Sequence, residues 1–195
     1  GLDLAAAGLT PTPRGLIAAD ANGQTAAPHI YAVGDVIGPP SLAASAMEQG
    51  RRAMCHALGL PHPEAHNQIP IGIYTIPELS SVGLSVEQAE EKHGAIVGRA
   101  RFDEVARGQI ANAQDGLLKL VADGQGKKLL GVHIVGAGAT ELIHLGQVAL
   151  AAQWDIDQFV EHVFNFPTLA EAYRVAALDI VETRAQLARE QKKSA

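Results

Sequence analysis

Two apolar runs separated by a glycine-containing turn are the feature that most constrains the fold of this 195-residue chain. Residues 116–122 and 128–135 are rich in leucine and valine, and the sequence Asp-Gly-Gln-Gly at 123–126 lies between them. This arrangement predicts an antiparallel β-hairpin. A lone hairpin is at best marginally stable in water, so further strands or helices must cover it.

The rest of the C-terminal half supplies such elements. Ser85 followed by Gln88 is a capping-box pattern that predicts a short helix to about residue 93, and Thr168 followed by Glu171 repeats the pattern before the last helix. We expect other helices at 139–153 and 156–162, and other strands at 69–75, 96–102 and 109–113. Antiparallel strands with helices grouped around them define an α+β domain: an antiparallel sheet with flanking helices.

The chain divides into two blocks. Residues 59–68 contain two prolines, a glycine and no hydrophobic periodicity, which predicts a linker. We therefore expect one domain at 69–195 and a separate block at 1–58.

The N-terminal block predicts one strand followed by one helix. The apolar run Ile30–Val33 predicts a short buried strand, residues 15–18 offer a second short strand, and Ser41 is a suitable N-cap for a helix from 42 to about 58. Such a unit needs neighbouring strands, which the preceding residues hardly supply. We expect this block to be the last strand–helix piece of a larger α/β domain.

Gly34 and Asp35 directly follow this expected strand. Open α/β sheets bind ligands at the carboxyl ends of their strands, where a carboxylate can accept hydrogen bonds from ligand hydroxyls. The free N–H groups at the start of the next helix, near Leu42 and Ala43, favour an electron-rich ligand atom. The alternative is that Gly34 and Asp35 form an ordinary turn.

Residues 25–35 resemble the second flavin-binding fingerprint of the flavoprotein pyridine nucleotide–disulfide oxidoreductases, and the resemblance continues in order through 72–78, 131–133 and 164–177. It implies that 1–58 is the end of the FAD-binding domain, in which Asp35, after Gly34, holds the ribityl hydroxyls of FAD. The Ala43 amide, beside Leu42, would stabilise negative charge on the reduced flavin. It also implies that 69–195 is the dimerisation domain of a homodimer.

The resemblance departs from the family pattern at one position. Family members usually carry His-Pro-Thr-x-x-Glu, in which the histidine reaches across the dimer, whereas this chain has Phe166 in the histidine position and keeps Glu171. Phenylalanine cannot transfer a proton, which argues against a dithiol reductase. The surrounding residues resemble the soluble transhydrogenase branch, which passes hydride between NADPH and NAD through FAD and needs stacking more than a proton shuttle. The alternative is that Phe166 and Tyr173 are ordinary core residues and Glu171 is only a helix cap.

Three functions remain open for the chain. The first is that the chain is the C-terminal part of an FAD-dependent transhydrogenase. The second is that it is part of a dithiol reductase of the dihydrolipoyl dehydrogenase or mercuric reductase type. The third is that it is a stand-alone non-catalytic dimerisation module. Residues 136–141 do not complete a Gly-x-Gly-x-x-Gly motif, and Cys55 is the only cysteine. We therefore expect the chain alone to bind no FAD and to be inactive.

Composition excludes several other partners. A net charge of −6 without a basic stripe argues against nucleic acid and anionic membranes, and no apolar run is long enough for a membrane span. A single cysteine favours a reducing compartment, so we expect a cytoplasmic protein. His62 and His66 lie in the proline-containing linker, where we expect their side chains to be exposed to water. We therefore expect no metal site.

Overall fold

The computed structural model describes residues 1–62 and 68–194, and the chain divides into two compact units, Gly1–Asn67 and Gln68–Ala195. Residues 63–67, which belong to the expected linker and include His66, lie outside the described residues. Among the helices of the described residues, none has the length and apolar character needed to cross a membrane.

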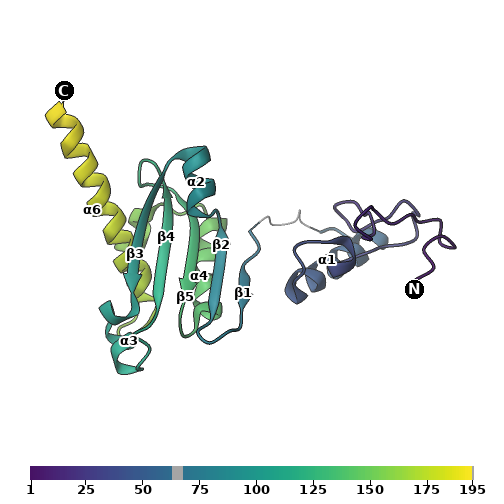
Figure 1. The fold of residues 1–195 in the computed structure, drawn as a ribbon, viewed down its shortest axis with the longest axis horizontal. Coiled ribbons are helices and arrows are strands. Elements are labelled where there is room, and N and C mark those ends of the chain that lie inside the picture. The colour runs from purple at the N-terminus through teal and green to yellow at the C-terminus, as the bar shows by residue number, and fades with distance from the viewer. Residues whose placement is uncertain (63–67, 195) are drawn as a thin grey trace. The chain divides into compact units, whose positions relative to one another are not determined.

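The second unit is built on a five-stranded antiparallel sheet (Figure 1). Its order is β1-β2-β5-β4-β3. The bounds are Ile71–Ile73 for β1, Leu79–Gly83 for β2, Ala95–Arg101 for β3, Leu117–Asp123 for β4 and Leu129–Val135 for β5. Strands β4 and β5 form the predicted hairpin, whose turn is closed by the Asp123 carboxylate accepting the Lys127 and Lys128 amides. The predicted fold class is confirmed.

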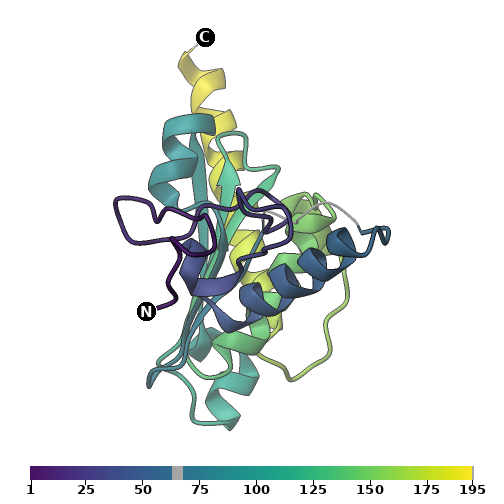
Figure 2. The same ribbon diagram turned by 90° about the vertical axis from the view of Figure 1, so that its right-hand side faces the viewer.

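Helices cover the two faces of the sheet unequally. Helices α4 (Ala139–Ala151) and α6 (Glu171–Ser194) pack on one face, with α5 (Ile156–Glu161) against α6, while α2 (Val86–His93) lies on the other side of the sheet (Figures 1 and 2). The predicted capping box of Ser85 and Gln88 is present at the start of α2. The main hydrophobic core therefore lies between the sheet and the pair α4 and α6.

Close approach of α6 to the sheet depends on Gly98 in β3. A Cβ atom built on Gly98 would lie 2.0 Å from the Ala176 carbonyl oxygen and 2.6 Å from Ile180. Both of these α6 residues are fully buried. Only glycine at position 98 lets the α6 backbone rest directly on the strand.

Tyr173 joins α6 to α4 inside this core. Its buried hydroxyl donates to the Leu142 carbonyl (2.8 Å) and accepts from the Gly146 amide (3.1 Å), two groups that lie one turn apart on α4. Its ring stacks on Phe159 of α5 with a centroid distance of 5.5 Å. Burial raises the pKa of the Tyr173 phenol far above its ordinary value, so this hydroxyl stays protonated as a donor.

Carboxylates accept hydrogen bonds from the backbone of β3, one of the two edge strands of the sheet. On β3, the Arg99 amide donates to Asp179 of α6 (2.9 Å), and the Arg101 amide donates to Glu104 (2.7 Å). Because β3 is an edge strand with β4 as its neighbour in the described sheet, these amides point away from the hydrogen bonds that join β3 to β4. Side chains thus provide the acceptors that a further strand would otherwise supply.

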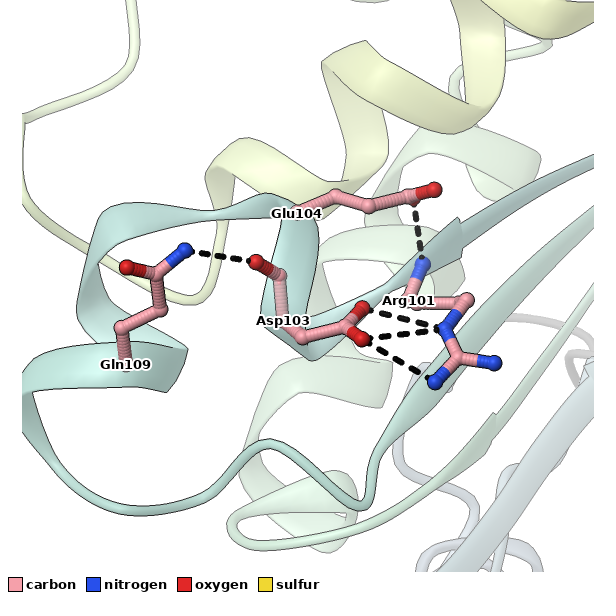
Figure 3. Close-up of polar contacts among 4 residues, drawn as sticks. All are labelled: Arg101, Asp103, Glu104 and Gln109. Atoms are coloured by element: carbon pink, nitrogen blue, oxygen red, sulfur yellow. Dashed lines mark hydrogen bonds and ion pairs between the residues drawn. The ribbon is translucent and has the colours of Figure 1, made fainter.

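A polar turn follows β3 and explains one wrong prediction (Figure 3). The Arg101 guanidinium pairs with Asp103 (3.0 Å), and the Gln109 side chain donates to the Asp103 carbonyl (2.8 Å). These bonds close a 3-10 turn, Phe102–Glu104, and the short helix α3, Ala106–Ile110. The predicted strand at 109–113 is wrong because the Ala113 amide also bonds within this turn, to a carbonyl five residues earlier.

The first unit contains less regular structure than we predicted. It has a 3-10 turn, Gly34–Ile37, helix α1, Ala43–Ala57, and a small apolar cluster around Leu9, Ile17 and Ala32. The predicted strand at Ile30–Val33 is wrong: only an isolated bridge joins Tyr31 to Gln24. The backbone of this segment is used in local turns, for example from the Ile30 amide to the Ala27 carbonyl (2.9 Å). The expected strand at 15–18 is absent from the described residues as well.

Replacing Tyr173 by phenylalanine tests the link between α4 and α6. We expect Tyr173→Phe to lower the free energy of unfolding by about 1–3 kcal/mol, because two buried backbone groups lose a partner. Urea unfolding followed by fluorescence of Trp154, the only tryptophan and a member of the second unit, measures the change. Tyr74→Phe, at an exposed site, is the control and should change stability by less than about 0.5 kcal/mol. Equal stability of Tyr173→Phe and the parent chain would contradict this account.

Candidate functional site

Gly34 and Asp35 form a tight turn held against α1. Gly34 has φ +75°, in the left-handed region, and its amide donates to the Gln49 side chain on α1 (2.7 Å). A Cβ atom at Gly34 would lie 3.1 Å from the Ala46 Cβ, so both conformation and packing favour glycine. The Asp35 side chain is exposed, and no hydrogen bond to its carboxylate is formed by the described residues.

The start of α1 offers free backbone donors. The helix begins at Ala43 with Leu42 as N-cap, and the first helical bond runs from the Ala46 amide to the Leu42 carbonyl (2.9 Å). The three preceding amides, Ala43 to Ser45, have no backbone acceptor in the described residues. The prediction of Ser41 as N-cap is wrong, because Leu42 takes that position and provides no side-chain bond.

A buried hydroxyl also lacks a partner beside these donors. Ser45 is 6% exposed, and its Oγ has no hydrogen-bond partner among the described residues. A helix N-terminus carries a partial positive charge. Free amides and an orphan hydroxyl at the start of α1, together with the unpaired Asp35 carboxylate, fit a ligand that has both electron-rich atoms and hydroxyl groups. These properties fit a flavin and its ribityl chain.

Phe166 is not a core residue of the described chain. It lies in the loop between α5 and α6 and is 74% exposed, whereas Tyr173, seven residues later, is fully buried. The part of the alternative interpretation that placed Phe166 in a core is therefore wrong.

Glu171 acts as a helix cap in this structure. Its carboxylate accepts the Thr168 amide at 3.0 Å, which is half of the predicted capping box. The other half is absent, because the Thr168 hydroxyl donates instead to the Asn165 carbonyl (2.7 Å). The two bonds fix the loop that carries Phe166 onto the first turn of α6.

Other exposed apolar side chains lie in the segments that follow β1 and β3, at the end of the sheet where these strands finish, and in the loop that precedes α6. We call the set the apolar rim; its members come from the β1–β2 loop, from α3 and from the α5–α6 loop, and are Tyr74, Ile76, Ile110, Val163 and Phe166. Figure 1 shows α3 at this end and the C-terminus of α6 at the opposite end, so α6 starts on the side of the rim. The sequence patterns did not identify the rim, because they do not place separate loops at one end.

Glu78 anchors the loop that carries Tyr74 and Ile76. Its carboxylate accepts the Thr140 hydroxyl (2.7 Å) and the Thr140 amide (3.0 Å) at the start of α4. These hydrogen bonds lower the pKa of the Glu78 carboxyl, because they favour its charged form. Sequence reasoning missed this role, since the partners lie 62 residues apart.

Comparison with known proteins defines the class to which this fold belongs. Residues 69–177 match the family model described as "Pyridine nucleotide-disulphide oxidoreductase, dimerisation domain", and residues 2–50 match "Pyridine nucleotide-disulphide oxidoreductase". The chain belongs to the pyridine nucleotide-disulphide oxidoreductase family.

Particular relatives share a more specific name. The chain is 50% identical over 181 residues to a soluble pyridine nucleotide transhydrogenase of Mycobacterium bovis (strain BCG / Pasteur 1173P2), and 47% identical over 183 residues to one of Photobacterium profundum. These matches cover 92% and 91% of the chain but only 39% of each relative. The chain thus spans about two fifths of the length of these relatives.

Solved structures show the same fold. LpdA from Mycobacterium tuberculosis matches with a TM-score of 0.82 and 26% identity, over 91% of the chain and 39% of that protein. The HOCl-induced flavoprotein disulfide reductase RclA from Escherichia coli matches with a TM-score of 0.81 and 23% identity, over 88% of the chain and 40% of that protein, and supports the fold alone.

Two substitutions at Glu171 test whether its carboxylate stabilises the start of α6 as a hydrogen-bond acceptor. Glu171→Ala removes the acceptor for the Thr168 amide and should lower the free energy of unfolding by about 1 kcal/mol. Glu171→Gln keeps an acceptor oxygen and should retain most of that stability. Thermal unfolding of both variants makes the measurement. If Glu171→Gln is as unstable as Glu171→Ala, the negative charge rather than the cap is responsible.

Proposed function

We propose that the chain is the C-terminal part of an FAD-dependent oxidoreductase that transfers hydride between NADPH and NAD. The observation that carries the proposal is Phe166 in the position of the family's histidine, exposed on a loop that Glu171 holds. The transhydrogenase names of relatives about half identical to the chain support it. In this proposal the parent enzyme is active, and the chain alone is inactive and holds no flavin.

FAD would supply the centre that accepts hydride from one nicotinamide and returns it to another. On this chain, Asp35 after Gly34 would bind the ribityl hydroxyls, since its carboxylate is exposed and accepts no hydrogen bond within the described residues. The Ala43 amide, next to Leu42 at the start of α1, would stabilise negative charge at the facing edge of the ring.

Phe166 would keep water out of the site rather than move a proton. Hydride transfer between two stacked rings needs orientation and a dry environment, which an apolar side chain provides. A dithiol reductase needs a proton-transferring group near its thiols, and phenylalanine has none. Glu171 would act as a positioning residue, because its carboxylate bonds the loop and not a reacting group.

The apolar rim would be a contact with a second copy of the enzyme, making a homodimer through the C-terminal domain. A dimerisation-domain match and exposed apolar side chains gathered at one end support this part of the proposal. In such a dimer, Phe166 would reach the flavin of the partner subunit, as the family resemblance implies. The word "soluble" in the relatives' names supports a cytoplasmic location without a membrane partner, and the net charge of −6 supports the absence of a nucleic-acid partner.

Kinetics of the full-length parent enzyme test the hydride proposal. We expect NADPH to reduce the flavin and thio-NAD to reoxidise it in anaerobic stopped-flow experiments, with no dithiol required. Phe166→Leu should keep both rates within a few-fold, and Phe166→Ala should slow them by about tenfold as water enters. Leu187→Ala, on the far part of α6, is the control. Turnover that requires a disulfide substrate would overturn the proposal.

Sedimentation of the 195-residue chain tests the dimer proposal separately. We expect a concentration-dependent dimer whose dissociation constant rises about 10–100-fold in Ile76→Glu, because an apolar side chain that becomes buried contributes about 1.5–3 kcal/mol. Leu187→Glu, also at an exposed position, should leave the dissociation constant unchanged. A chain that stays monomeric at all concentrations, or an equal effect of both variants, would contradict a contact through the apolar rim.

A further inference from the structure

The sheet face opposite α4 and α6, here called the outer face, has polar and apolar side chains in separate rows. The strand register aligns Lys119 of β4 with His133 of β5, and His133 with Ser81 of β2. Two residues along each strand, Leu117, Val135 and Leu79 form the neighbouring row. Side chains two residues apart lie on the same face of a strand, so a polar row and an apolar row run side by side across three strands.

A hollow of about 320 Å³ lies over these two rows. Its walls include Lys119, His133 and Ser81 on the polar side and Leu79, Leu117 and Ile73 on the apolar side. Leu79 and Ile73 are 42% and 50% exposed, so apolar surface faces water at the edge of the hollow. A volume of this size is at the lower end of the range of small-molecule sites, about 300–1,000 Å³.

The polar side of the hollow carries one cation, Lys119. Lys119 forms no ion pair or side-chain hydrogen bond within the described residues. On its other side the register places another cationic residue, Arg99 of β3. Like charges directly opposite one another on a sheet are destabilising, so an anion beside Lys119 would relieve this repulsion, while Arg99 shares a second hollow with the carboxylates of Asp179 and Glu182.

Glu87 of α2 is an acidic residue that interacts electrostatically with Lys119 in this polar row. The hydrogen bond that the Ser85 hydroxyl donates to its carboxylate at 2.7 Å is the main cause that lowers the pKa of Glu87, and the charge of Lys119 adds a smaller effect in the same direction. Glu87 belongs to the cap of α2 and makes no ion pair with Lys119. The anion-binding capacity of Lys119 therefore remains available.

His133 is held in a fixed orientation at the centre of the row. Its Nε2 donates to the Leu84 carbonyl at 3.0 Å, because a carbonyl can only accept. Burial lowers the pKa of His133, so the ring is neutral near pH 7 and adds a polar wall rather than a second charge.

We propose that this hollow on the outer face binds a small anion with an apolar body, that is, a carboxylate or phosphate group attached to a ring or short chain. The Lys119 ammonium and the Ser81 hydroxyl meet the anionic group, and Leu79, Leu117 and Ile73 meet the apolar body. The site is independent of the proposed hydride transfer, since it uses neither the apolar rim nor the start of α1.

Titration of the 195-residue chain with phenyl phosphate and with benzoate, followed by ¹H–¹⁵N NMR, tests the proposal. We expect saturable shifts of the Ser81, Lys119 and His133 amides, with phenyl phosphate binding at least about tenfold more tightly than inorganic phosphate, because the apolar row adds burial. The phosphate and the carboxylate probe distinguish the two anionic groups that the site could prefer. Saturation by either one supports the proposal.

Variants identify the residues that contribute. Lys119→Met should weaken binding of the better probe about tenfold or more, while Lys127→Met, in the exposed turn between β4 and β5, should leave it unchanged. Leu79→Ser should reduce the preference for phenyl phosphate over inorganic phosphate. The same spectra report whether each variant is folded, and Lys119→Gln replaces Lys119→Met if it is not. Absence of saturation by both probes, or equal binding by the Lys119 variant and the parent chain, would overturn the proposal.

Discussion

A single tyrosine hydroxyl holds together the part of the molecule that carries the candidate chemistry. Tyr173 on α6 bonds the Leu142 carbonyl and the Gly146 amide of α4, inside a core that excludes water. The first turn of α4 in turn anchors the β1–β2 loop through Glu78, and the first turn of α6 anchors the Phe166 loop through Glu171. The positions of both loops, and so the shape of the apolar rim, depend on how these two helices are fixed against each other.

The same interactions explain why a proton-transferring side chain can be lost without loss of the scaffold. Glu171 keeps its bond to the Thr168 amide whatever residue occupies position 166, because that bond involves only backbone and the glutamate itself. The loop is therefore maintained by its cap, and the side chain at its tip is free to change the chemistry. The family fold can in this way accept a different side chain at position 166 while its core remains the same.

The elements that could be predicted from the sequence are those whose signal is local. The β4–β5 hairpin and the capping box of Ser85 and Gln88 are determined by neighbouring residues, and both are present. The sequence patterns missed strand β2, which pairs with the nearby β1 and with β5 about 50 residues later, and they missed the bond between Glu78 and Thr140, which are 62 residues apart. The strand expected at Ile30–Val33 failed for a related reason: its apolar residues need adjacent strands, and their backbone groups bond within local turns instead.

The carboxylates along β3 have a consequence for how copies of this domain can associate. An open sheet grows when the last strand offers its amides to an incoming chain, and here Asp179 and Glu104 already occupy the amides of Arg99 and Arg101. An arriving strand would have to displace two charged acceptors before forming its first ladder bond. The addition of a further strand, and with it the growth of a continuous sheet from domain to domain, is therefore disfavoured at this edge.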